Sequence, residues 1–306
     1  MRLSSTARLQ HRGDSSEKSL PVSGDHPNAL CLICASADTT VVISQGGRKL
    51  VKCRACSAAF LDPVPSEADL ARKFTDQYIT DIERLEGTFG KSRDTVLLRV
   101  AAEIQSRCRS GHILDVGCAG GHFLSKYFAS QAWQRYGVEP SRFAAERAAD
   151  SGVKILGGSV LGGDLPADFF DVITVIDVLY YFRQPQRELR ALRSALKPTG
   201  RLFIELPLAE TQLLRHTTKL GHLSGGTRSL LDSGHLYFLN PASIAHLLRE
   251  TAFKIQAIVP LPGIQQRRAH QALLFKSFYL ASRALWRASG GRWMFGPSFL
   301  VVAARA

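Results

Sequence analysis

The apolar and polar positions along the chain change period several times, and each change predicts a new strand or helix. From residue 93 onwards, segments with the spacing of an amphipathic helix alternate with short continuous apolar runs that are typical of buried strands. The predicted strands are His112–Val116, Tyr136–Glu139, Lys154–Leu156, Val172–Ile176 and Leu202–Leu206. The predicted helices are Val96–Cys108, Phe123–Ala132, Ser141–Ser151 and Gln186–Leu196. Strands that alternate with helices form parallel βαβ units, so we expect a three-layer, doubly wound α/β domain.

Four cysteines near the N-terminus form two C-x2-C pairs that are separated by 18 residues. They are Cys31, Cys34, Cys53 and Cys56. Between the pairs, Val41–Ser44 and Leu50–Lys52 predict a hairpin around Gly46 and Gly47, which would bring both pairs together. Four thiolates delivered in this way match a tetrahedral zinc site with no open position for water, and therefore a structural one. Two disulfides or four unlinked thiols are the alternatives.

Small and polar residues follow the predicted strands at the points where a ligand would bind. In open parallel sheets, ligands lie outside the carboxyl ends of the strands, where the strand order reverses. Gly117, Gly120 and Gly121 follow the first strand and permit a tight turn with close approach of a ligand to the backbone. Glu139 ends the second strand, where a carboxylate can accept hydrogen bonds from both hydroxyls of a ribose. The remaining positions are Ser159 and Val160 after the third strand, expected beside an adenine, and Asp177 at the end of the fourth.

The glycine turn is compatible with two kinds of nucleotide cofactor. Followed by an acidic residue about twenty positions later, such a turn also describes a nicotinamide dinucleotide site. The dinucleotide pattern G-x-G-x-x-G fails here, because Ala119 and His122 occupy its second and third glycine positions. Asp115, two residues before the first glycine, would repel a pyrophosphate and attract a cation. The turn therefore favours a positively charged cofactor.

At these residues the sequence resembles the class I S-adenosylmethionine-dependent methyltransferases. Leu114–Phe123 resembles their first motif, LDVGCGTGxF, and Gly234–Phe238 resembles the HLYFF segment of a branch that carries paired C-x2-C knuckles. Further matching segments are Val138–Ser141, Phe170–Ile173 and Leu196–Leu202. The resemblance covers roughly residues 30–260. It implies a Rossmann-like fold with a seven-stranded, mostly parallel sheet, a small N-terminal zinc ribbon, and S-adenosylmethionine as the cofactor.

The resemblance also assigns roles to single residues. It makes Asp115, Gly117, Ala119 and Gly121 positions of the cofactor turn, Glu139 the ribose ligand and Asp177 a neighbour of the methionine end. Two positions depart from the family pattern. Ala119 replaces the usual middle glycine, and Tyr181 replaces a histidine, so no catalytic histidine is expected at that point.

Methyl transfer from a sulfonium is an in-line displacement whose leaving thioether needs no acid, so catalysis depends mainly on positioning. A base is required only if the acceptor is a hydroxyl group or a carbon acid. His235 is the first candidate for this base because imidazole titrates near neutral pH, and Tyr181 and Tyr237 are the next. The alternatives are a structural, hydrogen-bonded role for His235 and a place in the wall of the cofactor pocket for Tyr181.

The methyl acceptor is the least specified feature of the sequence. From the zinc-ribbon branch we expect a small molecule, namely a sugar, a glycan precursor or a secondary metabolite. The formal net charge of +13 also admits an RNA methyltransferase, although basic and aromatic residues do not alternate around the cysteine pairs. A non-catalytic adaptor that binds zinc and the cofactor is the third hypothesis. Within the long insertion Leu208–Asp232, Arg215, Lys219 and Arg228 either face an anionic acceptor or lie in solvent.

The C-terminal part of the chain is basic. No Asp or Glu occurs from Thr251 to Ala306, and Ile264–Ser289 has a helical pattern. Leu274, Phe278 and Leu285 share one face of this helix, and Arg268, Lys276, Arg283 and Arg287 share the opposite one. Such a helix either lies on an anionic membrane or packs its apolar face on the sheet with its charges in water. Ser298–Ala303 is expected to be the last strand, antiparallel to Phe253–Val259.

These features divide the chain into four segments. We expect a disordered tail over 1–28, the zinc ribbon over 29–62, a linker with N-terminal helices over 63–110, and the methyltransferase domain over 111–306, with insertions at 208–232 and 262–296. The tail lacks the apolar core of a secretory signal, and no stretch approaches the ~20 apolar residues that span a bilayer. Six cysteines without a secretion signal indicate a cytoplasmic location, with peripheral contact to the inner face of the membrane through residues 264–289 as a second option.

Overall fold

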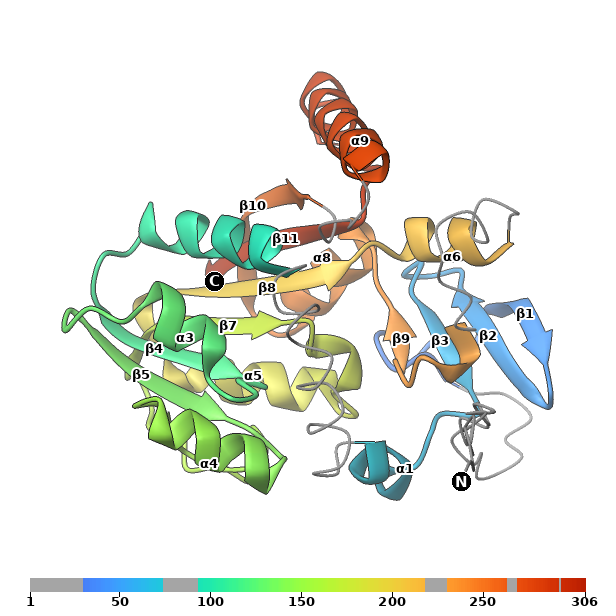
Figure 1. Ribbon diagram of the computed structural model, residues 1–306. Coiled ribbons are helices and arrows are strands. Elements are labelled where there is room, and N and C mark those ends of the chain that lie inside the picture. Colours follow the sequence, from blue (N-terminus) through green and yellow to red (C-terminus); the bar gives the residue numbers. More distant parts are fainter. Residues whose placement is uncertain (1–29, 74–92, 218–229, 263–268, 292) are drawn as a thin grey trace, which may run out of the picture.

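A seven-stranded sheet forms the centre of the computed structural model, which describes residues 30–73, 93–217, 230–262, 269–291 and 293–306. Its strands are β4 (Gly111–Val116), β5 (Trp133–Val138), β6 (Lys154–Ile155), β7 (Phe170–Ile176), β8 (Leu196–Pro207), β10 (Phe253–Leu261) and β11 (Ser298–Arg305). They lie in the order β10-β11-β8-β7-β4-β5-β6. The strands from β8 to β6 pair in parallel, and β11 is antiparallel to both of its neighbours. The doubly wound, mostly parallel sheet predicted from the sequence is thus confirmed (Figure 1).

Helices cover both faces of this sheet, because successive side chains of a strand point to opposite faces. On β4, Leu114 belongs to one apolar cluster and Ile113 to the other, and on β8 Ile204 and Phe203 divide in the same way. The first cluster is completed by α5 (Pro185–Ala195) and α8 (Pro241–Glu250). The second is completed by the helix over residues 93–105 and by α3 (His122–Tyr127). The continuous apolar runs in the sequence therefore reflect strands that are buried on both sides.

Helix α3 is shorter than the sequence predicted. It ends at Tyr127 instead of Ala132. Phe128 leaves the helix and packs its ring against Phe123 and Trp133, with centroids 5.4 and 5.0 Å away. The chain can then turn directly into β5, which starts at Trp133.

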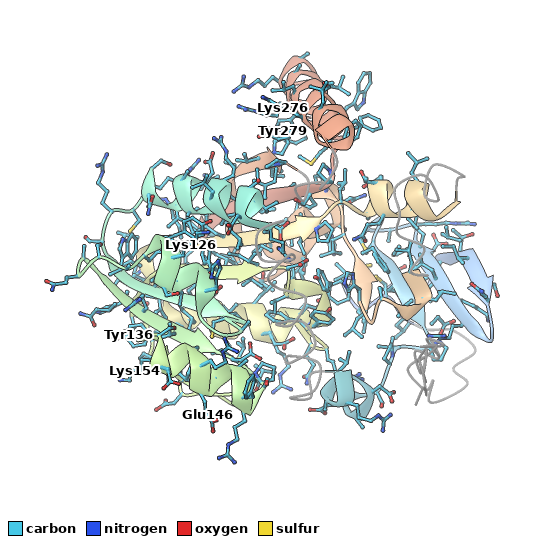
Figure 2. The ribbon with its side chains drawn as sticks, viewed as in Figure 1. Lys126, Tyr136, Glu146, Lys154, Lys276 and Tyr279 are labelled. Carbon is cyan, nitrogen blue, oxygen red and sulfur yellow. The ribbon has the colours of Figure 1, made fainter. Side chains whose placement is uncertain are left out.

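Polar contacts fix two of the helices that surround the glycine turn. Lys126 on the last turn of α3 forms an ion pair with Asp94 at 2.7 Å, which ties α3 to the helix over residues 93–105 (Figure 2). The next helix, α4 (Arg142–Asp150), begins as the sequence predicts, since the Ser141 side chain accepts a hydrogen bond from the Ala144 amide. These contacts define the last turn of α3 and the first turn of α4.

A second, smaller sheet combines the N-terminal module with a distant segment of the chain. It contains β1 (Thr39–Gln45), β2 (Arg48–Cys53), β3 (Ala59–Asp62) and β9 (Tyr237–Phe238), all antiparallel. The predicted hairpin is present, and its turn is formed by Gly46 and Gly47 with φ angles of 57° and 76°. Both are in the left-handed region that a two-residue hairpin turn requires. Figure 1 shows β9 beside β3, although the two are far apart in the sequence.

The remaining elements are short helices and 3-10 turns between the strands, together with the long helix α9. They are α1 (Glu67–Lys73), the 3-10 turns η1 (Leu179–Tyr181) and η2 (Leu230–Asp232), α6 (Ala209–Thr217), and α9 (Ala269–Ala288), which lies between β10 and β11. The expected tail over 1–28, Lys219 and Arg228 lie outside the described residues, as does the side chain of Arg215. In the part that is described, no helix is long and apolar enough to cross a bilayer.

Candidate functional site

The turn between β4 and α3 has three residues in the left-handed region. The φ angles of Gly117, Ala119 and Gly121 are 73°, 46° and 78°. A Cβ atom on Gly117 would lie 2.4 Å from Cγ2 of Val178, and one on Gly121 would lie 2.6 Å from Oγ of Ser151. Glycine is therefore required at both positions for space as well as for conformation. Ala119 adopts the same left-handed conformation, so the turn keeps its shape at the position where the family has glycine.

Two buried carboxyl groups face this turn. Asp115 Oδ1 accepts a hydrogen bond from Thr174 Oγ1 at 2.6 Å. Glu139 accepts one from the amide of Ala119 at 2.8 Å and one from the amide of Ser141 at 3.0 Å. Burial raises the pKa of both groups, and the charge of Glu139 adds to the effect at Asp115, whose pKa is about 7. The hydrogen bond from Ala119 holds the Glu139 carboxylate beside the glycine turn, and the bond from Ser141 holds it at the start of α4.

Neither carboxyl group has an ion-pair partner among the residues that the structure describes. Buried acids without a cation are costly, and they are usually found where a ligand supplies the missing charge. The free lone pairs of Asp115 suit a cation, and those of Glu139 suit hydroxyl donors. A cofactor with positive charges and a ribose therefore fits these residues, whereas a pyrophosphate does not.

The segment after β6 lies directly beside Glu139. The Glu139 amide donates a hydrogen bond to the carbonyl oxygen of Gly157 at 3.0 Å. Val160 is buried, and Ser159 is exposed with its Oγ accepting from the Gly162 amide at 3.0 Å. The structure thus brings the predicted adenine and ribose positions to neighbouring strand ends.

Asp177 lies at the end of β7 and takes part in an ion pair that the sequence did not predict. Its φ angle is 59°, an unusual value for a residue with a side chain. Arg93, from the helix over residues 93–105, pairs with Asp177 and also with Glu205 on β8, the latter at 3.3 Å. Burial raises the pKa of Glu205, and Arg93 opposes this rise. Glu205 lies near the end of β8, at the same edge of the sheet, so the strand pattern in the sequence could have indicated it. No sequence pattern indicated Arg93.

An aromatic cluster, formed by Tyr180, Tyr181, His235 and Phe238, continues from Asp177. The hydroxyl of Tyr180 donates to Asp177. His235 stacks on Tyr180 with ring centroids 3.7 Å apart and an interplanar angle of 27°. Tyr181 meets His235 edge-on at 5.6 Å, and Phe238 lies 5.7 Å away. Tyr181 and His235, two of the three predicted catalytic residues, lie together in this cluster. Tyr180, which no sequence pattern indicated, also belongs to it.

Tyr237, the third predicted catalytic residue, is fully buried. Its hydroxyl donates to the carbonyl oxygen of Leu179 at 2.6 Å and lies 3.2 Å from that of Phe182. Burial raises the pKa of Tyr237 well above its ordinary value. A phenol in this state does not exchange protons with a substrate near neutral pH. The geometry therefore favours a structural role for Tyr237, which holds the main chain of η1, over the catalytic role expected from the sequence.

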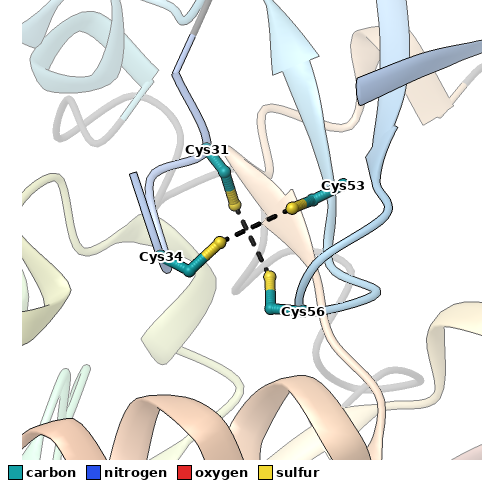
Figure 3. Close-up of side chains that lie close together, drawn as sticks. All are labelled: Cys31, Cys34, Cys53 and Cys56. Carbon is teal, nitrogen blue, oxygen red and sulfur yellow. Dashed lines mark hydrogen bonds between the residues drawn. The ribbon is translucent and has the colours of Figure 1, made fainter. Parts of the chain in front are cut away.

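The four cysteines of the N-terminal module converge on one point (Figure 3). Their sulfur atoms all lie within 4.8 Å of one another, with 3.6 Å between Cys31 and Cys56 and 3.5 Å between Cys34 and Cys53. None of the cysteines forms a disulfide, which removes that alternative. A tetrahedral metal bound at about 2.3 Å by each thiolate sets its sulfur atoms about 3.8 Å apart. The donor set and its spacing thus fit a four-coordinate metal.

The cysteine module is hydrogen-bonded to the segments that carry the aromatic cluster. The Leu61 amide donates to the carbonyl oxygen of Leu236, and the Leu236 amide donates to that of Tyr180, both at 3.0 Å. On the other side, Nε2 of Gln186 donates to the carbonyl oxygens of Leu32 and Ile33 at 2.9 and 2.7 Å, within the first cysteine pair. The module therefore contacts the segment that carries His235 and Phe238, and it also contacts α5, which follows η1 in the chain.

Comparison with known proteins also indicates a methyltransferase, in agreement with the geometry of the site. A family model described as a methyltransferase domain matches residues 78–258. The chain is 35% identical over 124 residues to the mitochondrial ubiquinone biosynthesis O-methyltransferase of Schizosaccharomyces pombe, which covers 37% of this chain and 44% of that protein. It is 32% identical over 189 residues to the tRNA U34 carboxymethyltransferase of Azotobacter vinelandii, which covers 58% of this chain and 56% of the relative. The chain thus spans about half the length of these curated relatives.

Solved structures share the fold at low sequence identity. Magnesium protoporphyrin IX methyltransferase from Synechocystis PCC 6803, with bound SAH, superposes with a TM-score of 0.53 at 16% identity, covering 79% of this chain and 100% of that one. A possible histamine N-methyltransferase from Thermotoga maritima gives a TM-score of 0.52 at 16% identity, covering 75% and 97%. These similarities concern the fold alone.

The burial of Asp115 makes a prediction for the ligand-free protein. Because its pKa is about 7 when folded and 3.8 in its ordinary range, the folded chain holds a proton between these pH values that the unfolded chain releases. The free energy of unfolding should therefore fall as the pH rises from about 4 to about 7. Asp115→Asn should remove this loss and be more stable than wild type at pH 8 by on the order of 2–4 kcal/mol, but not at pH 4.

Urea unfolding at several pH values measures this difference. Asp150→Asn, at an exposed position on α4, is the matched control and should follow the wild-type curve. An Asp115→Asn protein that is less stable than wild type at pH 8 would contradict the prediction.

Proposed function

The chain belongs to the S-adenosylmethionine-dependent methyltransferases, and we propose that its methyl acceptor is a small molecule: a sugar, a glycan precursor or a secondary metabolite. The relatives named above divide between ubiquinone biosynthesis and tRNA modification, so RNA is the alternative acceptor. One observation carries the proposal for a small molecule. The aromatic cluster of Tyr180, Tyr181, His235 and Phe238 adjoins Asp177, and neither Lys nor Arg is one of its members.

The donor side of the proposed site is the carboxyl edge of β4, β5 and β7. S-adenosylmethionine supplies a methyl group on a positively charged sulfur, together with an ammonium group, a ribose and an adenine. In the proposal, Asp115 attracts the charged methionine part, Asp177, which is paired with Arg93, borders it, and Glu139 accepts the ribose hydroxyls. Ser159 and Val160 line the adenine. The turn residues Gly117, Ala119 and Gly121 allow the cofactor to approach the backbone closely.

The acceptor side of the proposed site is the aromatic cluster. Planar side chains there can hold a ring of the acceptor and exclude water, which are the main requirements of an in-line methyl transfer. For a hydroxyl acceptor, an imidazole nitrogen of His235 takes up the proton. Tyr181 is proposed as part of the wall beside it. Arg183, the basic residue that follows the cluster, donates to the carbonyl oxygen of Pro65 and supports the main chain there.

RNA contacts would require a different surface. Recognition of single-stranded RNA combines base stacking with a positively charged groove along the backbone. The cluster supplies stacking rings, but neither Lys nor Arg is among its members, and Arg93 beside it is paired with Asp177 and Glu205. These features of the aromatic cluster therefore favour a small-molecule acceptor over RNA.

Transfer of a labelled methyl group tests the acceptor class. The purified protein is incubated with deuterated-methyl S-adenosylmethionine and either a small-molecule extract or total RNA of the source organism, followed by mass spectrometry. We expect the label in the small-molecule fraction, with a loss of at least about tenfold in Asp115→Asn and none in Asp150→Asn. If the acceptor is a hydroxyl, His235→Gln should lower the rate most at neutral and higher pH, where an imidazole is unprotonated and able to act as the base. Label in RNA alone would refute the small-molecule proposal and leave the methyltransferase itself intact.

We also propose that Cys31, Cys34, Cys53 and Cys56 hold one structural zinc ion. A module this small buries little apolar surface, so a metal would supply much of its stability. We expect about one zinc per chain by elemental mass spectrometry, and loss of this zinc in Cys53→Ser. Cys108→Ser is the matched control, because Cys108 lies outside the cluster and donates to the carbonyl oxygen of Ser110. Equal zinc content in the two variants would contradict the assignment.

A further inference from the structure

Helix α9 extends away from both sheets and leaves most of its surface open. Figure 1 shows it projecting from the body of the molecule beyond β10. Leu273 and Leu280 are 67% and 53% exposed, and Phe278 is 42% exposed. In contrast, Ser282 is buried at 3%. Of the predicted apolar face, Phe278 is exposed and Leu285 is half-buried, whereas Arg268 and the side chain of Leu274 lie outside the described residues.

The exposed face of α9 combines leucines with cations. At about 100° per residue, Leu273 and Leu280 lie within about 20° of each other and nearly opposite Ser282. Lys276 and Arg287 are exposed and fall on the flank next to Leu280. Figure 2 shows Lys276 at the outer end of the molecule, near Tyr279. The outward face of α9 therefore combines apolar side chains with positive charges, whereas a helix that packs on a sheet normally exposes mainly polar side chains.

Two large aromatic side chains follow the helix directly. Trp293 is 64% exposed and Phe295 is 52% exposed, although Met294 between them is buried. The Trp293 amide donates to Oγ of Ser289, which holds this segment at the end of α9. Exposed tryptophan and phenylalanine are costly in water and are enriched where proteins meet the interface of a membrane.

The charges of this region have one sign. No acidic residue occurs between Thr251 and Ala306. Lys276, Arg283 and Arg287 have no ion-pair partner among the described residues, and the Arg283 guanidinium instead lies over the Tyr279 ring at 5.7 Å. Their positive potential is therefore not neutralised by the protein and attracts an anionic surface.

We propose that α9, with Trp293 and Phe295, docks the enzyme on the surface of an anionic bilayer. Leu273, Leu280 and Trp293 enter the region between headgroups and acyl chains, while Lys276 and Arg287 contact the anionic headgroups. The helix lies on the bilayer without crossing it, in line with its composition. A protein partner would need a matching acidic and apolar groove, whereas a membrane supplies both features at once. This inference does not depend on the identity of the methyl acceptor or on the proposed zinc site.

Vesicle sedimentation tests this surface with the whole 306-residue chain. Phosphatidylcholine vesicles are compared with vesicles that contain about 30% phosphatidylglycerol, at about 0.1 M salt. We expect the wild type to sediment with the anionic vesicles only, and the fluorescence of Trp293 to shift to shorter wavelength on binding. Lys276→Glu with Arg287→Glu should weaken binding at least tenfold, and Leu273→Ser with Leu280→Ser should weaken it without any change of charge.

The control variant carries the same change of charge elsewhere. Lys49→Glu with Lys154→Glu alters two exposed lysines, and Figure 2 shows Lys154 far from α9. This variant should bind anionic vesicles within about twofold of wild type. Equal loss in the control, or wild-type protein that stays in solution with both vesicle types, would overturn the proposal. So would a dimer in analytical ultracentrifugation that the two serine substitutions abolish, because the face would then belong to a second copy of the chain.

Discussion

Hydrogen bonds on the two sides of Leu236 connect the two sheets of this protein. Its carbonyl oxygen accepts from Leu61 on β3 and its amide donates to Tyr180 after β7, so one residue joins the cysteine module to the large sheet. The neighbouring positions depend on it: His235 stacks on Tyr180, and Tyr237 buries its hydroxyl against Leu179. The β3 end is in turn fixed by the cysteine knuckle, where the Cys53 amide donates to Ala58 at 2.8 Å. Order in the cysteine module and order in the aromatic cluster are therefore linked.

The cofactor side of the proposed site depends on a different physical constraint, which is the burial of two carboxyl groups. Asp115 and Glu139 are buried without a cation, and this arrangement costs stability in the free protein. The cost is tolerated because the glycine turn and the parallel strands hold the carboxyl groups through Thr174, Ala119 and Ser141. A cationic cofactor would relieve it. The carboxyl edge of the sheet is thus preorganised for its ligand, independently of the small sheet.

Much of the fold and of the donor site could be predicted from the sequence, because both depend on local patterns. The apolar runs marked the central strands, Ser141 marked the start of α4, and the spacing of the cysteines marked the metal-binding geometry. The pairing of β3 with β9 could not be predicted, since a strand of two residues has no periodicity. The ion pair of Arg93 with Asp177 also joins distant segments without a local signal. Tyr237 had the right residue type for catalysis, and only its burial separates a structural from a reactive hydroxyl.

Hydrogen exchange with and without a metal chelator tests most directly whether the cysteine module supports only the aromatic cluster and leaves the cofactor turn unchanged. If the cysteine module supports the acceptor side alone, a chelator should remove protection from the amides of Leu61 and Leu236 together. The amides of Gly117 and Cys118, which donate to Val138, should stay protected, and the affinity for S-adenosylmethionine should change by less than about twofold. Retained protection at Leu236 while the cysteine module opens, or an equal loss of protection at Gly117, would contradict this division.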